Sequence, residues 1–420
     1  MAMLNGADRG SVAIFPWGDV IEDFLTPIGL DVDAFCDRMT GGWLFGYVAA
    51  LQSAGWRPVI ICASTACDRP TQRVHAGTGA TIWIVPGRAV SLGRSSSWRS
   101  LRQWIAAPAT EFARILTKER CTAIVVQEYE YARFDRLVRL GRTLGIPVFA
   151  TFQGGDQTLS PVEAFVRHES LRQCAGLIVA SGAERARLTQ RYGPATSPVT
   201  DIPNPLDTTE WRAIDRGEAR QRLGLNPDAF LAINHGRIAI FRKGLDTLVQ
   251  AWARCGTAGL VVIGSGEDDE RFGRLLEHAN LPGVRWLASY STDRELMRTW
   301  LSAADIYVTA SRIEGMPVAP LEAMACGLPV VATDAQGLPD ILADGERSGG
   351  IIVPKDDPAA IAGAILRLRD DGGLRARFGA AARRRVETGF SIPQVGQQLD
   401  RLLSRTSAEV ESHRLHESFL

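Results

Sequence analysis

Short apolar runs alternate with longer amphipathic stretches along this chain, and the whole series occurs twice. The runs hold a few Val, Ile and Ala residues between turn formers, which is typical of buried parallel strands. They lie at residues 11–17, 58–63, 81–85, 123–127, 147–151 and 177–180, and then at 230–234, 260–263, 284–287, 306–309, 329–333 and 350–353. Stretches between them, such as 42–53, 244–255 and 357–369, have the spacing of helices. Because strand–helix alternation produces parallel sheets with right-handed crossovers, we predict two α/β domains of Rossmann-like type.

A stiff segment separates the two series. In Ile202-Pro203-Asn204-Pro205-Leu206-Asp207, two prolines flank one asparagine, and neither a helix interior nor a central strand accommodates them. We therefore predict a first domain over residues 1–204 and a second over residues 205–385. The remaining segment, 386–420, contains an amphipathic stretch at 390–403 that predicts a terminal helix.

Composition narrows the class of protein. The 47 basic residues balance the 47 acidic ones, which argues against a partner bound through bulk phosphate neutralisation, such as a nucleic acid. Seven scattered cysteines and six histidines show no disulfide or metal-ligand spacing, a pattern typical of a reduced, cytoplasmic protein without a metal. No run approaches the roughly 18 apolar residues of a membrane span. We expect a cytoplasmic protein whose membrane contact, where it has one, is peripheral at the cytoplasmic face.

One stretch, residues 87–103, departs from the alternation. It holds Arg88, Arg94, Arg99 and Arg102 with Trp98 and no acidic residue. Two interpretations remain open with even weight: a solvated loop, or a surface that meets an anionic acceptor or lipid headgroup through its arginines and the indole.

The longest motif follows the apolar run at 306–309 and reads S-R-I-E-G-M-P-V-A-P-L-E-A-M-A-C-G-L-P. Glu314 then lies at the carboxyl edge of the sheet, where open α/β sheets bind ligands, and we expect a helix to begin near Pro317. Glu322 lies on that helix, and its side chain leans toward the helix start, so both carboxylates reach one cleft. A carboxylate accepts hydrogen bonds from sugar hydroxyls. Gly315 lets the backbone approach an anion, and the rival interpretation, that Glu322 only complements a helix dipole, is weaker inside this motif.

A second loop at a carboxyl edge holds two cations. His235-Gly236-Arg237 follows the run at 230–234, and Lys243-Gly244 precedes the next helix. Two converging cations stabilise the negative charge that develops on a diphosphate leaving group, one as a planar fork and the other as a point charge. Both could instead be solvated, but a loop bounded by glycines favours the anion. Lys243 is also one of only three lysines, with Lys118 and Lys355, in a chain rich in arginine.

Three further loops are weaker evidence on their own. Gly41-Gly42 opens a helix and offers bare N–H groups to a phosphate. Gly264-Ser265-Gly266 follows a strand without completing a dinucleotide-binding fingerprint. Thr151-Phe152-Gln153-Gly154-Gly155-Asp156 places a polar side chain, Gln153, and two glycines at an edge of the first sheet.

Taken together, these motifs resemble the family 4 glycosyltransferases, a retaining family of GT-B architecture that includes sucrose synthases and bacterial mannosyl- and glucosyltransferases. The resemblance rests above all on Glu314 and Glu322 with seven residues between them, and it covers most of the chain. It implies a GT-B fold, with two Rossmann-like parallel-sheet domains facing a central cleft. It also implies that residues 386–420 cross back onto the first domain, as the terminal helix often does in transferases of this shape.

The resemblance implies a role for each motif. Arg237 and Lys243 would bind the donor diphosphate, Glu314 would hold the transferred sugar, and these three would form the catalytic group. Glu322 would hold the ribose hydroxyls, while the base would lie near residues 286–289. The implied donor-binding residues are Gly41, Gly42, Gly264, Gly266, Leu287, Gly315, Met316, Pro317, Val318 and Glu322.

One position departs from the family. Many relatives have a histidine in a T-x-H-G or T-x-H-D string where this chain has Gln153. Glutamine cannot titrate, so any acid–base role of that histidine is lost, although its amide can still bond the sugar or the acceptor. The front-face mechanism usually proposed for the family, in which the leaving phosphate takes the acceptor proton, needs no side-chain base.

We therefore predict a retaining hexosyltransferase that uses a UDP-, GDP- or ADP-sugar and a glycan, lipid-linked or small-molecule acceptor, without cofactor or metal, since no D-x-D motif follows a strand. Two alternatives remain open: a non-catalytic nucleotide-sugar-binding partner subunit, and a sugar-nucleotide epimerase of GT-B fold. A phosphorylase is disfavoured because it needs a lysine for pyridoxal phosphate. A dehydrogenase is disfavoured by the missing dinucleotide fingerprint.

Overall fold

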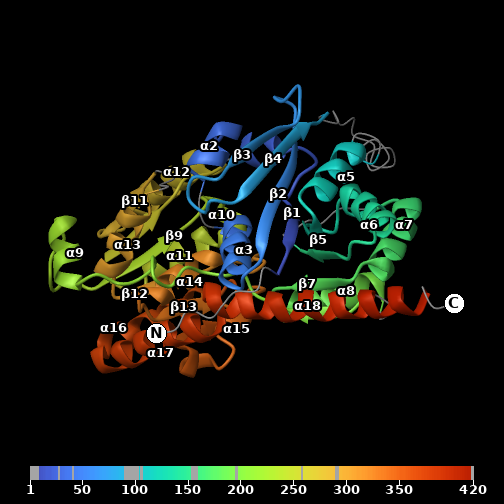
Figure 1. Ribbon diagram of the computed structural model, residues 1–420. Coiled ribbons are helices and arrows are strands. Elements are labelled where there is room, and N and C mark those ends of the chain that lie inside the picture. The colour runs from blue at the N-terminus through green and yellow to red at the C-terminus, as the bar shows by residue number, and fades with distance from the viewer. Residues whose placement is uncertain are drawn as a thin grey trace. The chain divides into compact units, whose positions relative to one another are not determined.

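The computed structural model describes residues 9–26, 29–39, 42–88, 104, 107–152, 159–193, 197–256, 259–288 and 293–417. The chain divides into two compact units (Figure 1). The first unit takes in Met1–Pro205 and Ile392–Leu420, and the second takes in Leu206–Ser391. Each unit is built on one sheet with helices on its faces, so the prediction of two α/β domains is confirmed.

The first sheet has eight strands in the order β3-β4-β2-β1-β5-β6-β7-β8. Their bounds are β1 Ser11–Phe15, β2 Arg57–Ser64, β3 Thr71–Val74, β4 Thr81–Pro86, β5 Cys121–Gln127, β6 Val148–Thr151, β7 Gly176–Val179 and β8 Val199–Asp201. All neighbours pair parallel except β3, which runs antiparallel to β4. The expectation of a purely parallel sheet is therefore wrong at β3, an edge strand whose four residues, T-Q-R-V, face water and carry no apolar run.

The second sheet is parallel throughout, in the order β11-β10-β9-β12-β13-β14. Its strands are β9 Leu231–His235, β10 Gly259–Ile263, β11 Val284–Leu287, β12 Ile306–Thr309, β13 Val330–Thr333 and β14 Gly350–Val353. Each of the six runs expected in this half of the chain is one of these strands.

Helices cover both sheets. In the first unit they are α1 Glu22–Leu25, α2 Val32–Asp37, α3 Gly42–Ser53, α5 Ala109–Lys118, α6 Ala132–Leu144, α7 Pro161–Gln173, α8 Gly182–Tyr192 and α18 Ile392–Glu417. In the second they are α9 Arg216–Arg222, α10 Ile240–Lys243, α11 Leu245–Trp252, α12 Asp269–Ala279, α13 Arg294–Ala303, α14 Val318–Ala325, α15 Leu338–Ile341, the 3-10 helix η3 Gly345–Ser348, α16 Pro358–Asp370 and α17 Gly372–Gly389.

Both faces of the central strands of each sheet are buried, which is why those strands are apolar without interruption. In β1, Val12 and Ile14 join one core cluster while Ala13 and Phe15 join the other, as the two-residue period of a strand requires. The terminal helix α18 packs on α3 within the first unit, and its Val395 and Leu399 are fully buried in the first of these clusters. A Cβ at Gly396 would lie 2.4 Å from the Ala50 carbonyl oxygen, so glycine lets the two helices approach closely.

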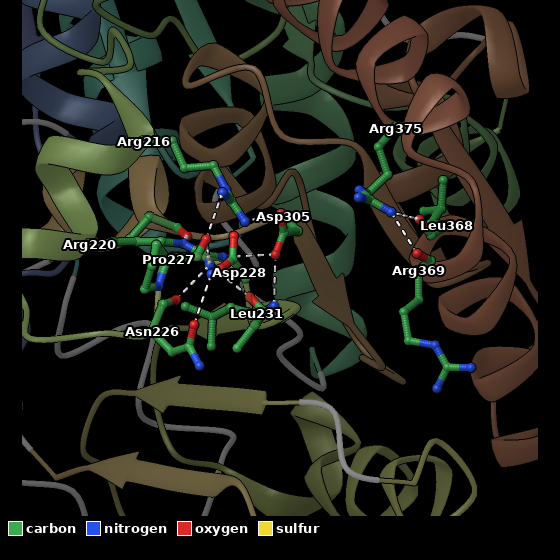
Figure 2. A network of polar contacts seen from close by, with 12 residues as sticks. Arg216, Arg220, Asn226, Pro227, Asp228, Leu231, Asp305, Leu368, Arg369 and Arg375 are labelled. Carbon is green, nitrogen blue, oxygen red and sulfur yellow. Dashed lines mark hydrogen bonds and ion pairs between the residues drawn. The ribbon is translucent and has the colours of Figure 1, made fainter.

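A buried arginine organises the amino ends of β9 and β12. Figure 2 shows Arg216 and Arg220 on α9 converging on Asp305, the residue before β12. The Arg220 guanidinium donates from all three of its nitrogens: to Asp305 Oδ2 at 2.9 Å, and to the carbonyls of Ala303, Asn226, Pro227 and Ala229. Asp305 Oδ2 also accepts the N–H of Leu231, where β9 begins. Burial lowers the pKa of Arg220 and Asp305 opposes that shift, so the two charges depend on each other.

We expect Arg220→Ala to lower the free energy of unfolding by about 3–5 kcal/mol, because it removes the buried partner of Asp305 and the donor to four carbonyls, and leaves only the exposed Arg216 on that carboxylate. Arg216→Ala is the matched control. Arg216 donates to the same carboxylate at 3.0 Å, but its side chain is 45% exposed, and removing it should cost less than about 1 kcal/mol. Urea unfolding measures both values, and equal losses for the two variants would contradict the assignment.

Candidate active site

The loops at the carboxyl edge of the second sheet approach each other so closely that glycine is required. Gly264, after β10, has φ +146°, and a Cβ there would lie 1.8 Å from the Gly236 carbonyl oxygen. Gly337, before α15, has φ +80°, and its Cβ would lie 1.9 Å from the Gly315 oxygen. These contacts place the loop after β10 against the loop after β9, and the loop after β13 against the loop after β12.

Arg312 fixes the loop between β12 and α14. Its guanidinium forms a two-pronged pair with Asp246 on α11, at 2.7 and 2.9 Å, and also donates to the Phe241 carbonyl. Its own N–H donates to the Arg242 carbonyl at 2.9 Å. The hydrogen bonds to Asp246 raise the pKa of Arg312. Burial raises the pKa of Asp246, but the bonds and charge of Arg312 together with backbone N–H groups bring that pKa below its ordinary value. The loop bearing Glu314 is therefore tied to the loop bearing Lys243.

The structure brings Lys243 and Glu314 into direct contact. Lys243 Nζ lies 2.7 Å from Glu314 Oε1, and the Ser311 hydroxyl donates to the same oxygen at 2.6 Å. The Glu314 side chain is 10% exposed and that of Lys243 is 30% exposed. The pair is therefore mostly buried and is reached by solvent mainly on the Lys243 side. Two residues that are 71 positions apart in sequence thus form one charged group.

Glu322 has a partner that the sequence did not identify. His235, the last residue of β9, places Nε2 2.8 Å from Glu322 Oε2. The Tyr307 hydroxyl donates to the His235 carbonyl at 3.3 Å, and its ring packs edge-on against the imidazole. The sequence places His235 directly before Gly236-Arg237 but does not indicate a contact with Glu322. That contact depends on the order of strands in the folded sheet, where β9 is the neighbour of β12, the strand that precedes α14.

Arg237 differs from Lys243 in having its charge available. It is exposed, and among the residues that the structure describes none forms a hydrogen bond or ion pair with its guanidinium. Its aliphatic stem passes Gly266, where a Cβ would lie 2.9 Å from Arg237 Cγ. Arg237 and Lys243 both follow β9, so they lie on the same loop and helix turn above the edge of the sheet.

The start of α14 adds donors to this edge. Pro317 is the N-cap and no side chain caps the helix, so the N–H groups of Val318 and Ala319 lack partners inside it. Gly315 is exposed, and Met316, Pro317 and Val318 are half-buried. The positive end of the helix and these N–H groups favour a negative ligand.

The ends of β10 and β11 form the neighbouring wall. The Gly264 N–H donates to the Leu287 carbonyl at 3.0 Å, and the Trp286 indole N–H donates to the Gly264 carbonyl at 3.0 Å. Leu287 is half-buried and packs on the core. Gly264, Gly266 and Leu287 therefore lie together in this unit.

The predicted residues of the first unit are placed only in part. Gly42 is the first residue of α3, whereas Gly41, Gln153 and most of the arginine-rich stretch, residues 89–103, lie outside the described residues. The described edge of this sheet holds a buried carboxyl, Glu184, in the first turn of α8. Its Oε2 accepts the Ala180 N–H at 2.9 Å, and it is 3% exposed.

Among the described residues, no three His, Cys, Asp or Glu side chains are grouped as a metal site requires. In the same part of the chain, no helix combines the length and the apolar character needed to cross a membrane.

Comparison with known proteins identifies relatives of both halves. Residues 215–385 match the family model of the glycosyl transferases group 1, and residues 44–210 match that of glycosyltransferase family 4. The D-inositol 3-phosphate glycosyltransferase of Thermomonospora curvata is 33% identical over 258 residues, which are 57% of this chain and 59% of that protein. The chain thus matches about three fifths of the length of this relative.

Solved structures share the fold. Sucrose-phosphate synthase from Thermosynechococcus elongatus superposes with a TM-score of 0.72 at 22% identity, covering 96% of this chain and all of that one. Anabaena HepE, solved in complex with UDP, gives 0.72 at 16% identity, with 94% and 100% covered. The GT-B fold expected from the sequence is confirmed.

We expect Gly337→Ala to displace the loop that holds Glu314. A Cβ there collides with the Gly315 backbone, so an overpacking cost of about 1–3 kcal/mol adds to a backbone cost of about 1–2 kcal/mol for the positive φ. Gly345→Ala is the control, since its φ is +56° but open space surrounds its Cβ. Only the first variant should speed amide exchange in residues 312–317, and faster exchange there in both variants would argue against the contact.

Stability should fall with rising pH because of Glu184. Burial raises its pKa from 4.5 to about 8, the Ala180 N–H acts in the opposite direction, and nearby Glu128 adds to the rise. The buried carboxyl therefore contributes its full stabilisation below about pH 4.5, where it is protonated in both the folded and the unfolded state. The free energy of unfolding then falls by up to about 1.4 kcal/mol per pH unit as the pH rises toward 8. Glu184→Gln has no carboxyl to ionise, so its unfolding free energy should fall less than that of the wild type between pH 5 and 8. Parallel profiles for the two proteins would refute this.

Proposed function

Because the chain belongs to the family 4 glycosyltransferases, we propose that it moves a hexose from a nucleoside diphosphate sugar to an acceptor hydroxyl, with retention at the anomeric carbon. Both halves match models of this family. The donor nucleotide we propose is a uridine, guanosine or adenosine diphosphate. The structural relative HepE, solved with UDP, is an example of the first.

The observation that supports this function best is the contact between Lys243 and Glu314. In a donor of this class the sugar and the outer phosphate share one bridging oxygen, so the groups that hold them must lie side by side. Glu314 accepts hydrogen bonds from the sugar hydroxyls, while Lys243 neutralises charge on the phosphate as the bond breaks. The ion pair holds both side chains in position before the donor arrives.

Arg237 completes the charge on the leaving group. Its guanidinium is exposed and without a partner among the described residues, so it binds the diphosphate without first giving up an ion pair. We propose that Arg237 and Lys243 supply the positive charge that a metal ion supplies in other transferases. The N–H groups of Val318 and Ala319 add partial positive charge at the same edge.

Glu322 holds the other end of the donor. His235 bonds Glu322 Oε2, and no described residue bonds Oε1, which leaves that oxygen for the two hydroxyls of a ribose. We place the base against the wall of Gly264, Gly266 and Leu287, which backbone and indole bonds between the ends of β10 and β11 hold in position. The family resemblance implies further phosphate contacts for Gly41 and Gly42, and an amide contact of Gln153 with the sugar or the acceptor, and we include these three residues in the proposal.

The acceptor is a glycan, a lipid-linked sugar or a small molecule with a free hydroxyl, and no cofactor takes part. Peripheral contact with a membrane belongs to the same proposal, in the case of a lipid-linked acceptor. The leaving phosphate takes the acceptor proton, since the described edge offers Glu314 only in an ion pair with Lys243.

Thermal stabilisation by nucleoside diphosphates and their sugars, measured without metal, tests the donor site. A ligand at about 100 times its Kd stabilises the folded protein by about 2.7 kcal/mol, so one nucleotide should raise the melting temperature by several degrees. Lys243→Ala should lower the affinity for that ligand about ten- to a hundredfold, because a hydrogen bond to a charged group contributes about 1.5–3 kcal/mol to binding. Lys355→Ala, which removes an exposed lysine of the same unit, should leave the shift unchanged.

The outcomes also separate the rival functions. No shift with any nucleotide would contradict the donor site. A shift without release of free sugar or transfer to water would favour a non-catalytic partner subunit. Conversion of one nucleotide sugar into another would favour an epimerase.

A further inference from the structure

Three large apolar side chains on α7 are exposed to solvent. The exposed fractions are 74% for Val162, 74% for Phe165 and 38% for Val166. Positions i, i+3 and i+4 lie on one side of a helix, so the three form a single apolar surface. They are three of the seven exposed large apolar residues among those the structure describes, and the other four are dispersed over β3 and the second unit.

A groove between α6 and α7 continues this surface. It has a volume of about 600 Å³, and Phe165 and Val166 line it together with Val138 of α6 and Trp104. The two helices lie side by side in the first unit (Figure 1) and are joined by a buried pair in which Arg167 bonds both oxygens of Asp135, at 2.8 and 2.9 Å. The apolar surface is therefore carried on a rigid helix pair.

The charges around the groove are mainly positive. Arg139 and Arg142 line it and are exposed, and Arg172 is exposed at the end of α7. Arg136 lies over the Trp104 ring at 5.4 Å. Of the carboxylates that line the groove, Asp135 is neutralised by Arg167, which leaves Glu169, itself bonded to Gln173.

We propose that this surface, Trp104 with the outward sides of α6 and α7, docks on an anionic membrane. Exposed apolar side chains beside arginines are the combination that inserts into the acyl boundary while the guanidinium groups bind lipid phosphates. The contact with the membrane is peripheral. It rests on the proposed glycosyltransferase function only for the acceptor, which would be presented at the lipid surface. Binding to vesicles needs neither donor nor transfer, so its failure is distinguishable from failure of the proposed reaction.

Co-sedimentation of the full chain with sucrose-loaded vesicles tests the proposal. We expect binding to phosphatidylcholine vesicles containing 30% phosphatidylglycerol, and little binding to pure phosphatidylcholine. Phe165→Ser should reduce binding about tenfold, through lost burial of the ring. Arg139→Gln and Arg142→Gln should each reduce it about fivefold, as one juxtamembrane cation is expected to do. High salt should weaken binding by the wild type and have less effect on a variant lacking both arginines.

Two exposed valines of the same unit give the matched control. Val162→Ser removes a 74% exposed side chain of the surface and should weaken binding, whereas Val74→Ser removes a 60% exposed side chain on β3 and should not. Unchanged melting temperatures show that the variants are folded. Equal binding to both kinds of vesicle, equal effects of the two valine substitutions, or a dimer in solution that Phe165→Ser dissociates would each overturn the proposal, the last by assigning the surface to a second copy of the chain.

Discussion

The second unit depends on one constraint: the loops after β9 and β12, far apart in sequence, must meet at the carboxyl edge of the sheet. The Arg312–Asp246 pair enforces this, since its two parallel hydrogen bonds at 2.7 and 2.9 Å fix orientation as well as distance. The backbone bond from Arg312 to Arg242 adds a second attachment. Lys243, at the end of α10, and Glu314, in the loop after β12, are therefore held beside each other. The charged pair at the site is thus a consequence of a structural ion pair behind it.

The two ends of the same sheet use charge in opposite ways. At the amino end, Arg220 is buried and donates from all three guanidinium nitrogens to Asp305 and to four carbonyls, so its charge serves the fold. At the carboxyl end, Arg237 has no partner among the described residues and Glu322 keeps one oxygen unbonded by them. A fully satisfied polar network gives rigidity, and a partly satisfied one leaves groups free for binding. The contrast explains how similar residues in one unit serve the scaffold at one edge and the ligand at the other.

Much of the fold followed from the sequence because both sheet faces are buried. A strand such as β12, buried on both sides, needs four apolar residues in a row, and such a run is visible without any structure. β3 and β8 were not predicted because an exposed or three-residue edge strand has no such run. The pairs His235–Glu322 and Ser311–Glu314 differ in how far they could be anticipated. The second is three residues apart, whereas the first joins positions 87 apart and depends on which strands are neighbours in the sheet.

The identity of residue 243 follows from the same geometry. The chain uses arginine almost everywhere a cation is needed, yet the residue beside Glu314 is one of three lysines. A guanidinium spreads its charge over a planar fork and is best satisfied by two parallel acceptors, as Arg312 is by Asp246. The Glu314 oxygen that faces residue 243 is already shared with the Ser311 hydroxyl and offers a single point of contact. The ammonium group of lysine bonds that one oxygen with a single N–H and retains two N–H donors for a phosphate. The planar guanidinium of an arginine bound to the same oxygen would direct its remaining N–H groups elsewhere.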